Sequence, residues 1–123
     1  MHRSRIGIVL VDHPEESYEA CLAFWAGVQG VRPTPDGPYA GVGEVGGLNL
    51  EVQRTGRGTP PRIHLDIESD DVAAEVIRLQ GLGGTVMEER DGYVIMQDPG
   101  GLLFCVVGVQ TGDQFVEDAR TWE

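Results

Sequence analysis

The sequence predicts an α+β protein in which a strand-helix-strand-strand-strand (βαβββ) unit occurs twice. In the second copy, apolar and polar residues alternate over 62–68, which indicates a strand with one apolar and one polar face. An apolar stripe at helical spacing predicts a helix over 70–82, and the glycines that follow end it. Three further segments complete the unit as strands, at 85–89, 92–97 and 102–107.

The first copy has the same order of elements. Residues 5–11 are expected to form its first strand, and Pro14 suits the first position of a helix that extends to about Val28. After that helix comes the short stretch 31–36, which is broken by prolines, and the next strands are expected at 39–45 and 48–54. The side of the helix that we expect to be buried comprises Tyr18, Cys21, Leu22, Trp25 and Val28.

Two short matches support the duplication. Arg5-Ile6 matches Arg62-Ile63, and Gly46-Gly47-Leu48 matches Gly100-Gly101-Leu102. Because helices on one face of each sheet leave its other face uncovered, two such sheets side by side would enclose a cup. The chain is therefore expected to be a single domain over 1–123, with one module at about 5–54, a connection at 55–61, a second module at about 62–108 and a tail at 109–123.

The tail is expected to contain a short helix. Asp113 can cap its start, and Phe115, Ala119 and Trp122 follow at helical spacing. We expect this segment to pack on the domain or to act as a lid.

Composition excludes several classes of function. The net charge is −11 and all nine basic residues are arginine, so a nucleic-acid-binding surface is not expected. The absence of lysine excludes Schiff-base chemistry at a side-chain amine. No apolar run is long enough to span a membrane, and residues 1–16 lack the features of a signal peptide, so a cytoplasmic protein is expected. The acidic surface favours a cationic ligand or serves solubility alone.

Several motifs resemble those of the vicinal oxygen chelate superfamily, and most closely its glyoxalase-like domains. They are Phe24-Trp25 with Gly30 after it, the strand 62–67, and Asp98-Pro99-Gly100-Gly101 before 104–107. The resemblance covers about 5–108. It implies two tandem βαβββ modules whose curved mixed sheets form a cup with the helices on the outer faces. It does not define a reaction, because glyoxalases, dioxygenases and bleomycin-resistance proteins share this fold.

The resemblance also implies four positions for metal ligands, on the first and last strand of each module. The two repeat matches place them at Gly7, Glu51, His64 and Cys105. Gly7 has no ligating side chain, and Cys105 offers a thiol where the family uses a carboxylate, so the usual site is incomplete. No cofactor is therefore expected. The alternative is a rearranged site in which Glu51, His64 and Cys105 hold zinc, iron or nickel.

Strand alternation predicts which side chains line the cup. One wall is expected to be polar and the other apolar, which suits a small amphipathic organic ligand. Gly7, Val9 and Val11 are expected to share this face. By the resemblance, a homodimer would build each cup from both subunits. The candidate ligand-binding residues are Asn49, Glu51, Gln53, Arg62, His64, Asp66, Leu103 and Cys105.

Three functions remain open from the sequence. The first is a metal-independent protein that binds a small molecule, for example one that sequesters a drug as bleomycin-resistance proteins do. The second is a lyase, isomerase or dioxygenase that uses the rearranged metal site. In a metal-free form of that enzyme, His64 acts as an acid or base oriented by Asp66 or Glu51. The third is a regulatory subunit whose cup is filled by a partner.

Overall fold

The structure, a computed structural model of residues 1–123, divides into two units. One unit comprises residues 8–64, and the other comprises residues 1–7 together with 65–123. The strands β1 (His2–Pro14) and β5 (Arg62–Ser69) each contribute to both units. None of the helices is both long and apolar enough to cross a lipid bilayer.

The unit of residues 8–64 has a mixed sheet with the strand order β2-β3-β4-β1. Strand β4 (Leu48–Thr55) runs parallel to the second half of β1 and antiparallel to β3 (Tyr39–Val45). The short edge strand β2 (Thr34–Asp36) pairs antiparallel with β3. As predicted, the β3–β4 hairpin turns at Gly46-Gly47, where both glycines have the positive φ that such tight turns require.

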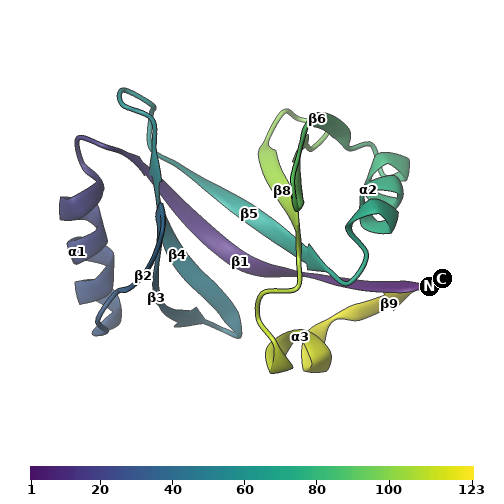
Figure 1. The fold of residues 1–123 in the computed structure, drawn as a ribbon, viewed down its shortest axis with the longest axis horizontal. Coiled ribbons are helices and arrows are strands. Elements are labelled where there is room, and N and C mark those ends of the chain that lie inside the picture. Colours follow the sequence, from purple (N-terminus) through teal and green to yellow (C-terminus); the bar gives the residue numbers. More distant parts are fainter. The chain divides into compact units, whose positions relative to one another are not determined.

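Helix α1 (Tyr18–Gln29) packs on one face of this sheet (Figure 1). The buried core between α1 and the sheet consists of Tyr18, Ala26, Val42 and Val52. The expectation that Val28 is buried is wrong, because its side chain is 60% exposed and Ala26 occupies the buried position instead. The expected helix start at Pro14 is also wrong. Strand β1 continues through Pro14, since its pairing with β4 extends to that residue.

The second unit repeats this topology with the order β6-β7-β8-β5. It contains α2 (Val72–Gly81), β6 (Thr85–Arg90), β7 (Tyr93–Gln97) and β8 (Leu103–Gly108). Strand β8 runs parallel to β5 and antiparallel to β7, as β4 does to β1 and β3. The two units thus confirm the predicted α+β fold with a duplicated βαβββ order.

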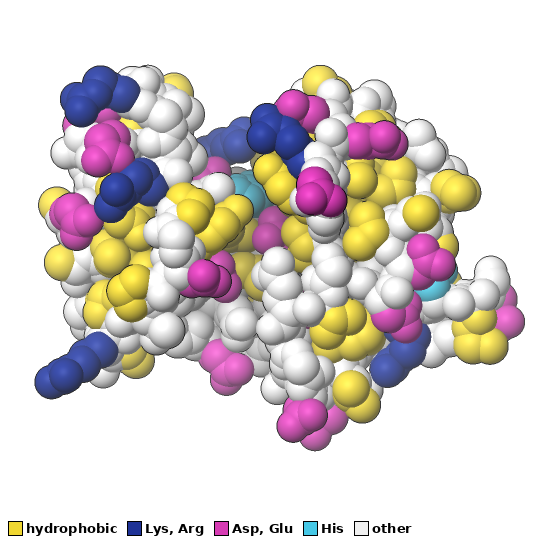
Figure 2. Space-filling view, viewed as in Figure 1, with side chains coloured by type: hydrophobic (Ala, Val, Ile, Leu, Met, Phe, Trp, Pro, Cys, Tyr) yellow, Lys and Arg dark blue, Asp and Glu magenta, His cyan; other side chains and the backbone are white.

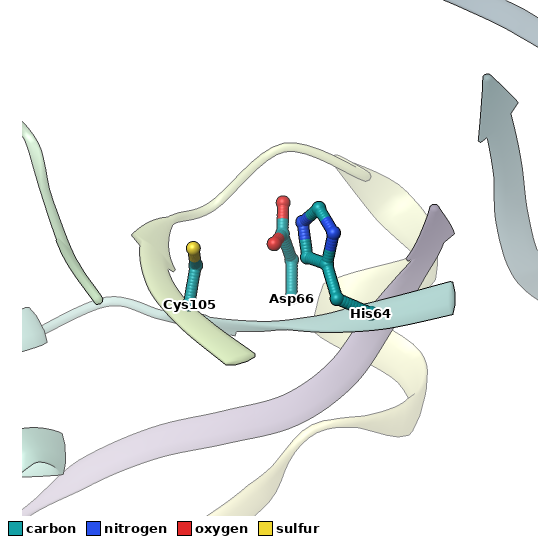
Figure 3. Close-up of side chains that lie close together, drawn as sticks. All are labelled: His64, Asp66 and Cys105. Carbon is teal, nitrogen blue, oxygen red and sulfur yellow. The ribbon is translucent and has the colours of Figure 1, made fainter. Parts of the chain in front are cut away.

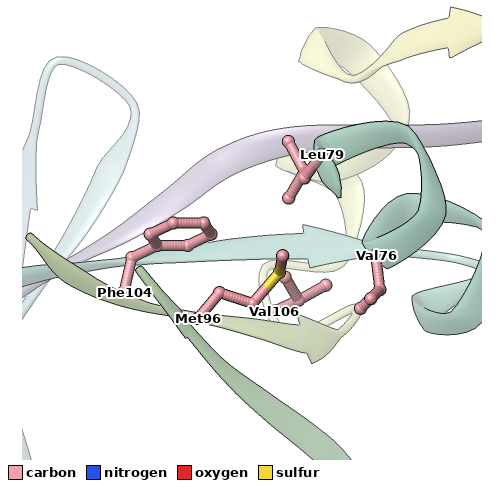
Figure 4. Close-up of a cluster of buried hydrophobic side chains, with 5 residues drawn as sticks. All are labelled: Val76, Leu79, Met96, Phe104 and Val106. Carbon is pink, nitrogen blue, oxygen red and sulfur yellow. The ribbon is translucent and has the colours of Figure 1, made fainter. Parts of the chain in front are cut away.

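Helix α2 begins at the N-cap residue Asp71, whose carboxylate accepts a hydrogen bond of 3.0 Å from the amide of Ala74. Its buried side packs on β7 and β8, and Figure 4 shows this core between the helix and the strands. The cluster consists of Val76, Leu79, Met96, Phe104 and Val106. Each such buried side chain stabilises the fold by about 1.5–3 kcal/mol.

The tail forms two elements instead of the one expected helix. Helix α3 (Asp113–Asp118) ends where Ala119 becomes extended, and β9 (Arg120–Trp122) then pairs antiparallel with the start of β1. The indole nitrogen of Trp122 donates to Ser4 Oγ at 2.9 Å. This anchor draws the tail into a strand, because a continued helix would carry Trp122 away from β1.

The register of β1 differs from the expected one by one residue. Val9 and Val11 lie opposite Leu50 and Val52, which belong to or pack against the α1 core, so they face the helix. Ile8, Leu10 and Asp12 therefore occupy the face expected for Gly7, Val9 and Val11. The repeat match failed because a shared dipeptide does not determine strand register.

The small size of Gly7 has a structural reason. A Cβ at this position would lie 2.6 Å from Cδ and 2.9 Å from Cγ of Glu68, and closer still to Oε2. Glu68 is fully buried, and Arg5 Nε donates to it at 2.8 Å. Gly7 therefore makes room for a buried carboxylate, and the position equivalent to His64 is Ile8, which also lacks a ligating atom.

Candidate functional site

The candidate ligand-binding residues lie on sheet faces that no helix of their own unit covers. Asn49, Glu51 and Gln53 alternate along β4 with Leu50 and Val52, which pack toward α1. On β8, Leu103 and Cys105 alternate with Phe104 and Val106, which pack beneath α2. On β5, Arg62 and His64 alternate with apolar residues and lie on the same face as Asp66. Asp66 lies opposite Cys105 of β8.

Asp12 is the centre of a charged network in the unit of residues 8–64. Its side chain is fully buried, and His64 Nδ1 lies 2.8 Å from its Oδ2. Arg62 Nε donates to the same oxygen at 3.1 Å. The His64 side chain is itself only 8% exposed, whereas Arg62 is 46% exposed and reaches solvent. A buried carboxylate is tolerated because these two donors compensate it.

This network fixes the orientation of His64. With Nδ1 turned toward Asp12, any further ligand of the ring must approach Nε2. The second oxygen of Asp12, Oδ1, is buried and makes no hydrogen bond. The sequence indicated Asp66 or Glu51 as the residue that orients His64 and missed Asp12, because the expected strand ended at Val11. Asp12 follows Ile8 and Leu10 at alternate positions of the chain, and this alternation was the signal that could have revealed it.

A hollow of about 310 Å³ lies beside β2, β3 and β4. Asn49 and Glu51, both expected from the sequence, line it, together with Tyr39. The lining contains three carboxylates, those of Asp36, Glu44 and Glu51, and no lysine or arginine. The hollow thus combines an aromatic ring with negative charge.

His64, Asp66 and Cys105 form the one group of potential metal ligands. One donor atom from each lies within 4.8 Å of the others. His64 and Asp66 are alternate residues of β5, and Cys105 is in register with Asp66 on β8. Figure 3 shows the three side chains projecting from the same side of these strands.

The donor set fits a zinc ion better than a magnesium or calcium ion. Imidazole, carboxylate and thiolate are zinc ligands, whereas the harder cations prefer oxygen alone. The hydrogen bond from His64 Nδ1 to Asp12 matches the carboxylate partner that metal-ligating histidines usually have. The grouping differs from the expected one in a single residue, with Asp66 in the place of Glu51.

One family model covers most of the chain. The family model described as a glyoxalase-like domain matches residues 9–107. No curated protein matches the chain. A solved structure titled NAD-dependent benzaldehyde dehydrogenase, from Legionella pneumophila, has a TM-score of 0.64 at 12% identity, over 84% of this chain and 98% of that one.

Two longer proteins share the fold. A Mn(II)-bound glyoxalase from Novosphingobium aromaticivorans has a TM-score of 0.59 at 23% identity, over 88% of this chain and 40% of its own. A 2,2',3-trihydroxybiphenyl 1,2-dioxygenase from Sphingomonas wittichii has a TM-score of 0.59 at 13% identity, over 88% and 41%. The chain thus spans about two fifths of each. At these identities the likeness shows the fold alone.

Proposed function

Because the chain belongs to the glyoxalase-like domain family, we propose that it binds a small amphipathic organic cation in the hollow beside β2–β4. The observation that carries this proposal is the lining of the hollow, which has three carboxylates and no basic side chain. A drug-sequestering role is one form of this function.

Charge and shape both favour such a ligand. A cation about 5 Å from a carboxylate gains roughly 3 kcal/mol of Coulomb energy at the effective dielectric constant of a protein surface, before desolvation is subtracted. The ring of Tyr39 offers a face for an apolar group, and the amide of Asn49 can both donate and accept hydrogen bonds. The net charge of −11 also raises the local concentration of cations.

Replacing Glu51 by glutamine is expected to weaken the binding of cationic amphiphiles about tenfold, or roughly 1.4 kcal/mol. The substitution preserves the shape of the side chain and removes one of the three charges in the lining. Isothermal titration calorimetry with a panel of cationic aromatic compounds and their neutral analogues measures the effect.

Glu88→Gln is the matched control for Glu51→Gln, since Glu88 is an exposed glutamate on β6 in the other unit. Its affinity for the cations should equal that of the wild type. Equal binding of cationic and neutral analogues, or an unchanged affinity in Glu51→Gln, would contradict the proposal.

A second candidate function is a metal-dependent enzyme, either a lyase or isomerase that holds zinc or a dioxygenase that holds iron, since zinc has no redox chemistry. The grouping of His64, Asp66 and Cys105 specifically favours it. In this candidate, these residues would hold the ion, and Asp12 would keep the His64 ring oriented. A zinc ion there would supply a Lewis acid for an oxygen of the bound ligand. Iron and nickel are the alternatives that metal analysis distinguishes.

If this second candidate is right, protein purified without chelator holds about one zinc ion per chain. Cys105→Ser and His64→Ala should each lose most of it, because three protein ligands leave little redundancy. Cys21→Ser, which removes the other free cysteine, should retain the ion. Elemental analysis by mass spectrometry provides the measurement.

Two further variants identify the third zinc ligand. Asp66→Ala should lose the ion and Glu51→Ala should keep it, whereas the reverse pattern would restore the site expected from the sequence. Wild-type protein without stoichiometric metal would refute the enzyme candidate and leave the binding proposal intact.

A further inference from the structure

A groove of about 510 Å³ lies between helix α2 and the β6–β7 hairpin. It is on the helix-covered side of the sheet, because its walls include Val76 and Val94, which belong to or pack against the core beneath α2. Cys105 of the candidate metal site projects from the opposite face of that sheet. Figure 2 shows hydrophobic side chains over α2 and β6 in the right half of the view. The volume is within the range of small-molecule sites, about 300–1,000 Å³.

Aliphatic side chains leave this groove open. Helix α1 packs the aromatic rings of Tyr18 and Trp25 toward its own sheet, whereas the side chains with which α2 packs are aliphatic. Ile77 borders the groove and is 69% exposed, so a large apolar side chain there faces water. A ligand in the groove would cover it, which is favourable. The aliphatic walls comprise Val72, Ala73, Val76, Ile77, Val86 and Val94.

An irregularity in β6 turns a carboxylate toward the groove. The pairing of β6 with β7 shifts register between Val86 and Glu88. Val86 lies opposite Met96 of the core beneath α2, and strict alternation would place Glu88 on the same face. After the shift it is Glu89 that lies opposite Val94, which also packs against that core. The bulge therefore brings Glu89 to the face of the apolar walls.

The charge of Glu89 is the uncompensated one in the lining. Glu89 makes no ion pair or side-chain hydrogen bond. The other charged residue of the lining, Arg90, is held by Glu88, with Nε 2.8 Å from Oε1 and Nη2 2.9 Å from Oε2. An apolar groove with one unpaired carboxylate is complementary to an apolar molecule that carries one positive charge.

We propose that this groove is a second binding site of the chain and that it takes a primary aliphatic amine. The hydrocarbon chain lies against the valines of α2 and of the hairpin, and the ammonium group pairs with Glu89. An ammonium group has three donors, and the side-chain carbonyl of Gln80, which also lines the groove, offers a further acceptor. The site is independent of the proposed function, because α2, β6 and β7 do not belong to the unit that contains the hollow beside β2–β4.

NMR titration of the ¹⁵N-labelled protein tests the site and its ligand class. n-Octylamine should shift the amide signals of α2, β6 and β7. n-Hexylamine should bind about tenfold more weakly, because two fewer methylene groups are buried. 1-Octanol, which has the same chain without the charge, should bind about threefold to fivefold more weakly than octylamine. Shifts confined to β2–β4, or equal affinities for octylamine and either of the other two compounds, would overturn the proposal.

A charge variant tests the role of Glu89. Glu89→Gln should weaken octylamine about threefold to fivefold and leave the affinity for 1-octanol unchanged. Asp91→Asn is the matched control, since Asp91 is exposed at the tip of the same hairpin and does not line the groove. It should alter neither affinity. An unchanged affinity for octylamine in Glu89→Gln would overturn the proposal, and Glu89 would then serve as a charge that protects the edge strand β6 from pairing with another chain.

A filled groove provides the second test. Ala73 is an exposed residue of the groove wall, and the ring of Ala73→Phe should occupy the space and abolish the binding of both octylamine and 1-octanol. Ala20→Phe, at an exposed alanine of α1 in the other unit, is the control and should bind both as the wild type does. Octylamine binding that survives Ala73→Phe would place the ligand elsewhere and overturn the proposal.

Discussion

Gly7→Ala is expected to lower the free energy of unfolding by about 4 kcal/mol. The added Cβ would displace the side chain of Glu68, which has no room to move because it is fully buried. Its carboxylate accepts hydrogen bonds from Arg5, from the hydroxyl and amide of Thr111, and from the amide of Gln110. Moving it would break these bonds and leave Arg5 without its buried partner.

Urea denaturation followed by circular dichroism measures this loss. Gly81→Ala is the control, because a Cβ there meets nothing within 4 Å and alanine favours the helix. In a Glu68→Ala background, Gly7→Ala should cost almost nothing further, since the clash is gone. A Gly7→Ala variant as stable as the wild type would show that Glu68 can relocate cheaply.

The strands of both units were predictable where turns and alternation agree. Strand β3 matches its expected bounds, and β7 and β4 differ from theirs by one residue at one end. Gly46-Gly47 and Asp91-Gly92 bound these strands, and both turns depend on local backbone preferences that a sequence displays directly. The duplicated fold followed from the same local signals.

The elements that sequence reasoning misplaced depend on contacts distant in the chain. Pro14 is a helix starter by local preference, yet pairing with Thr55 keeps it in β1. Trp122 has helical spacing to Phe115, yet a hydrogen bond to Ser4 draws it into β9. Tertiary contacts override propensity at both places, and one sequence does not reveal them.

The sequence predicted which side chains of the candidate site share one face of the sheet, but not the hydrogen bonds that join them to Asp12. Alternation placed His64, Asp66 and Cys105 on one side of their strands, and the structure has them together. Asp12 was missed because a lone carboxylate near a strand end usually faces water. Its burial depends on His64 and Arg62, which lie about fifty residues away in the sequence.

Glu75 of α2 shows the same limit, since nothing in the sequence pattern singled it out. It is fully buried, and His2 and Ser4 contact its carboxylate at 2.8 Å. Arg78 donates two further hydrogen bonds to it, and its guanidinium stacks 3.8 Å from the ring centre of Trp122. One carboxylate thus joins the first strand, α2 and the last strand.

Glu75→Gln is expected to destabilise the protein by about 3 kcal/mol at neutral pH. Glutamine keeps the size of the side chain but removes the charge that Arg78 and His2 contact, and its amide group cannot accept all four hydrogen bonds. Urea denaturation at a series of pH values measures the effect. Glu88→Gln, which removes the partner of Arg90 at an exposed site, is the control and should change stability little.

The shifted pKa of Glu75 determines how its contribution to stability changes with pH. Burial alone would raise the pKa of Glu75, but hydrogen bonds from Arg78, His2 and Ser4 outweigh burial and hold the pKa below its ordinary value of 4.5. The unfolded chain therefore takes up the proton at a higher pH than the folded protein does. The stabilisation by Glu75 is fully present above pH 4.5 and is lost as the pH falls through the folded pKa.

The difference in stability between the wild type and Glu75→Gln should therefore be constant near neutral pH and should shrink below pH 4.5. The subtraction removes the acid sensitivity that Glu68 contributes to both proteins, because the pKa of Glu68 is also lowered by its hydrogen bonds in spite of burial. A difference that stayed constant down to the acid transition would mean that the charge of Glu75 does not stabilise the fold. In that case the junction of β1, α2 and β9 would depend on packing around Trp122 alone.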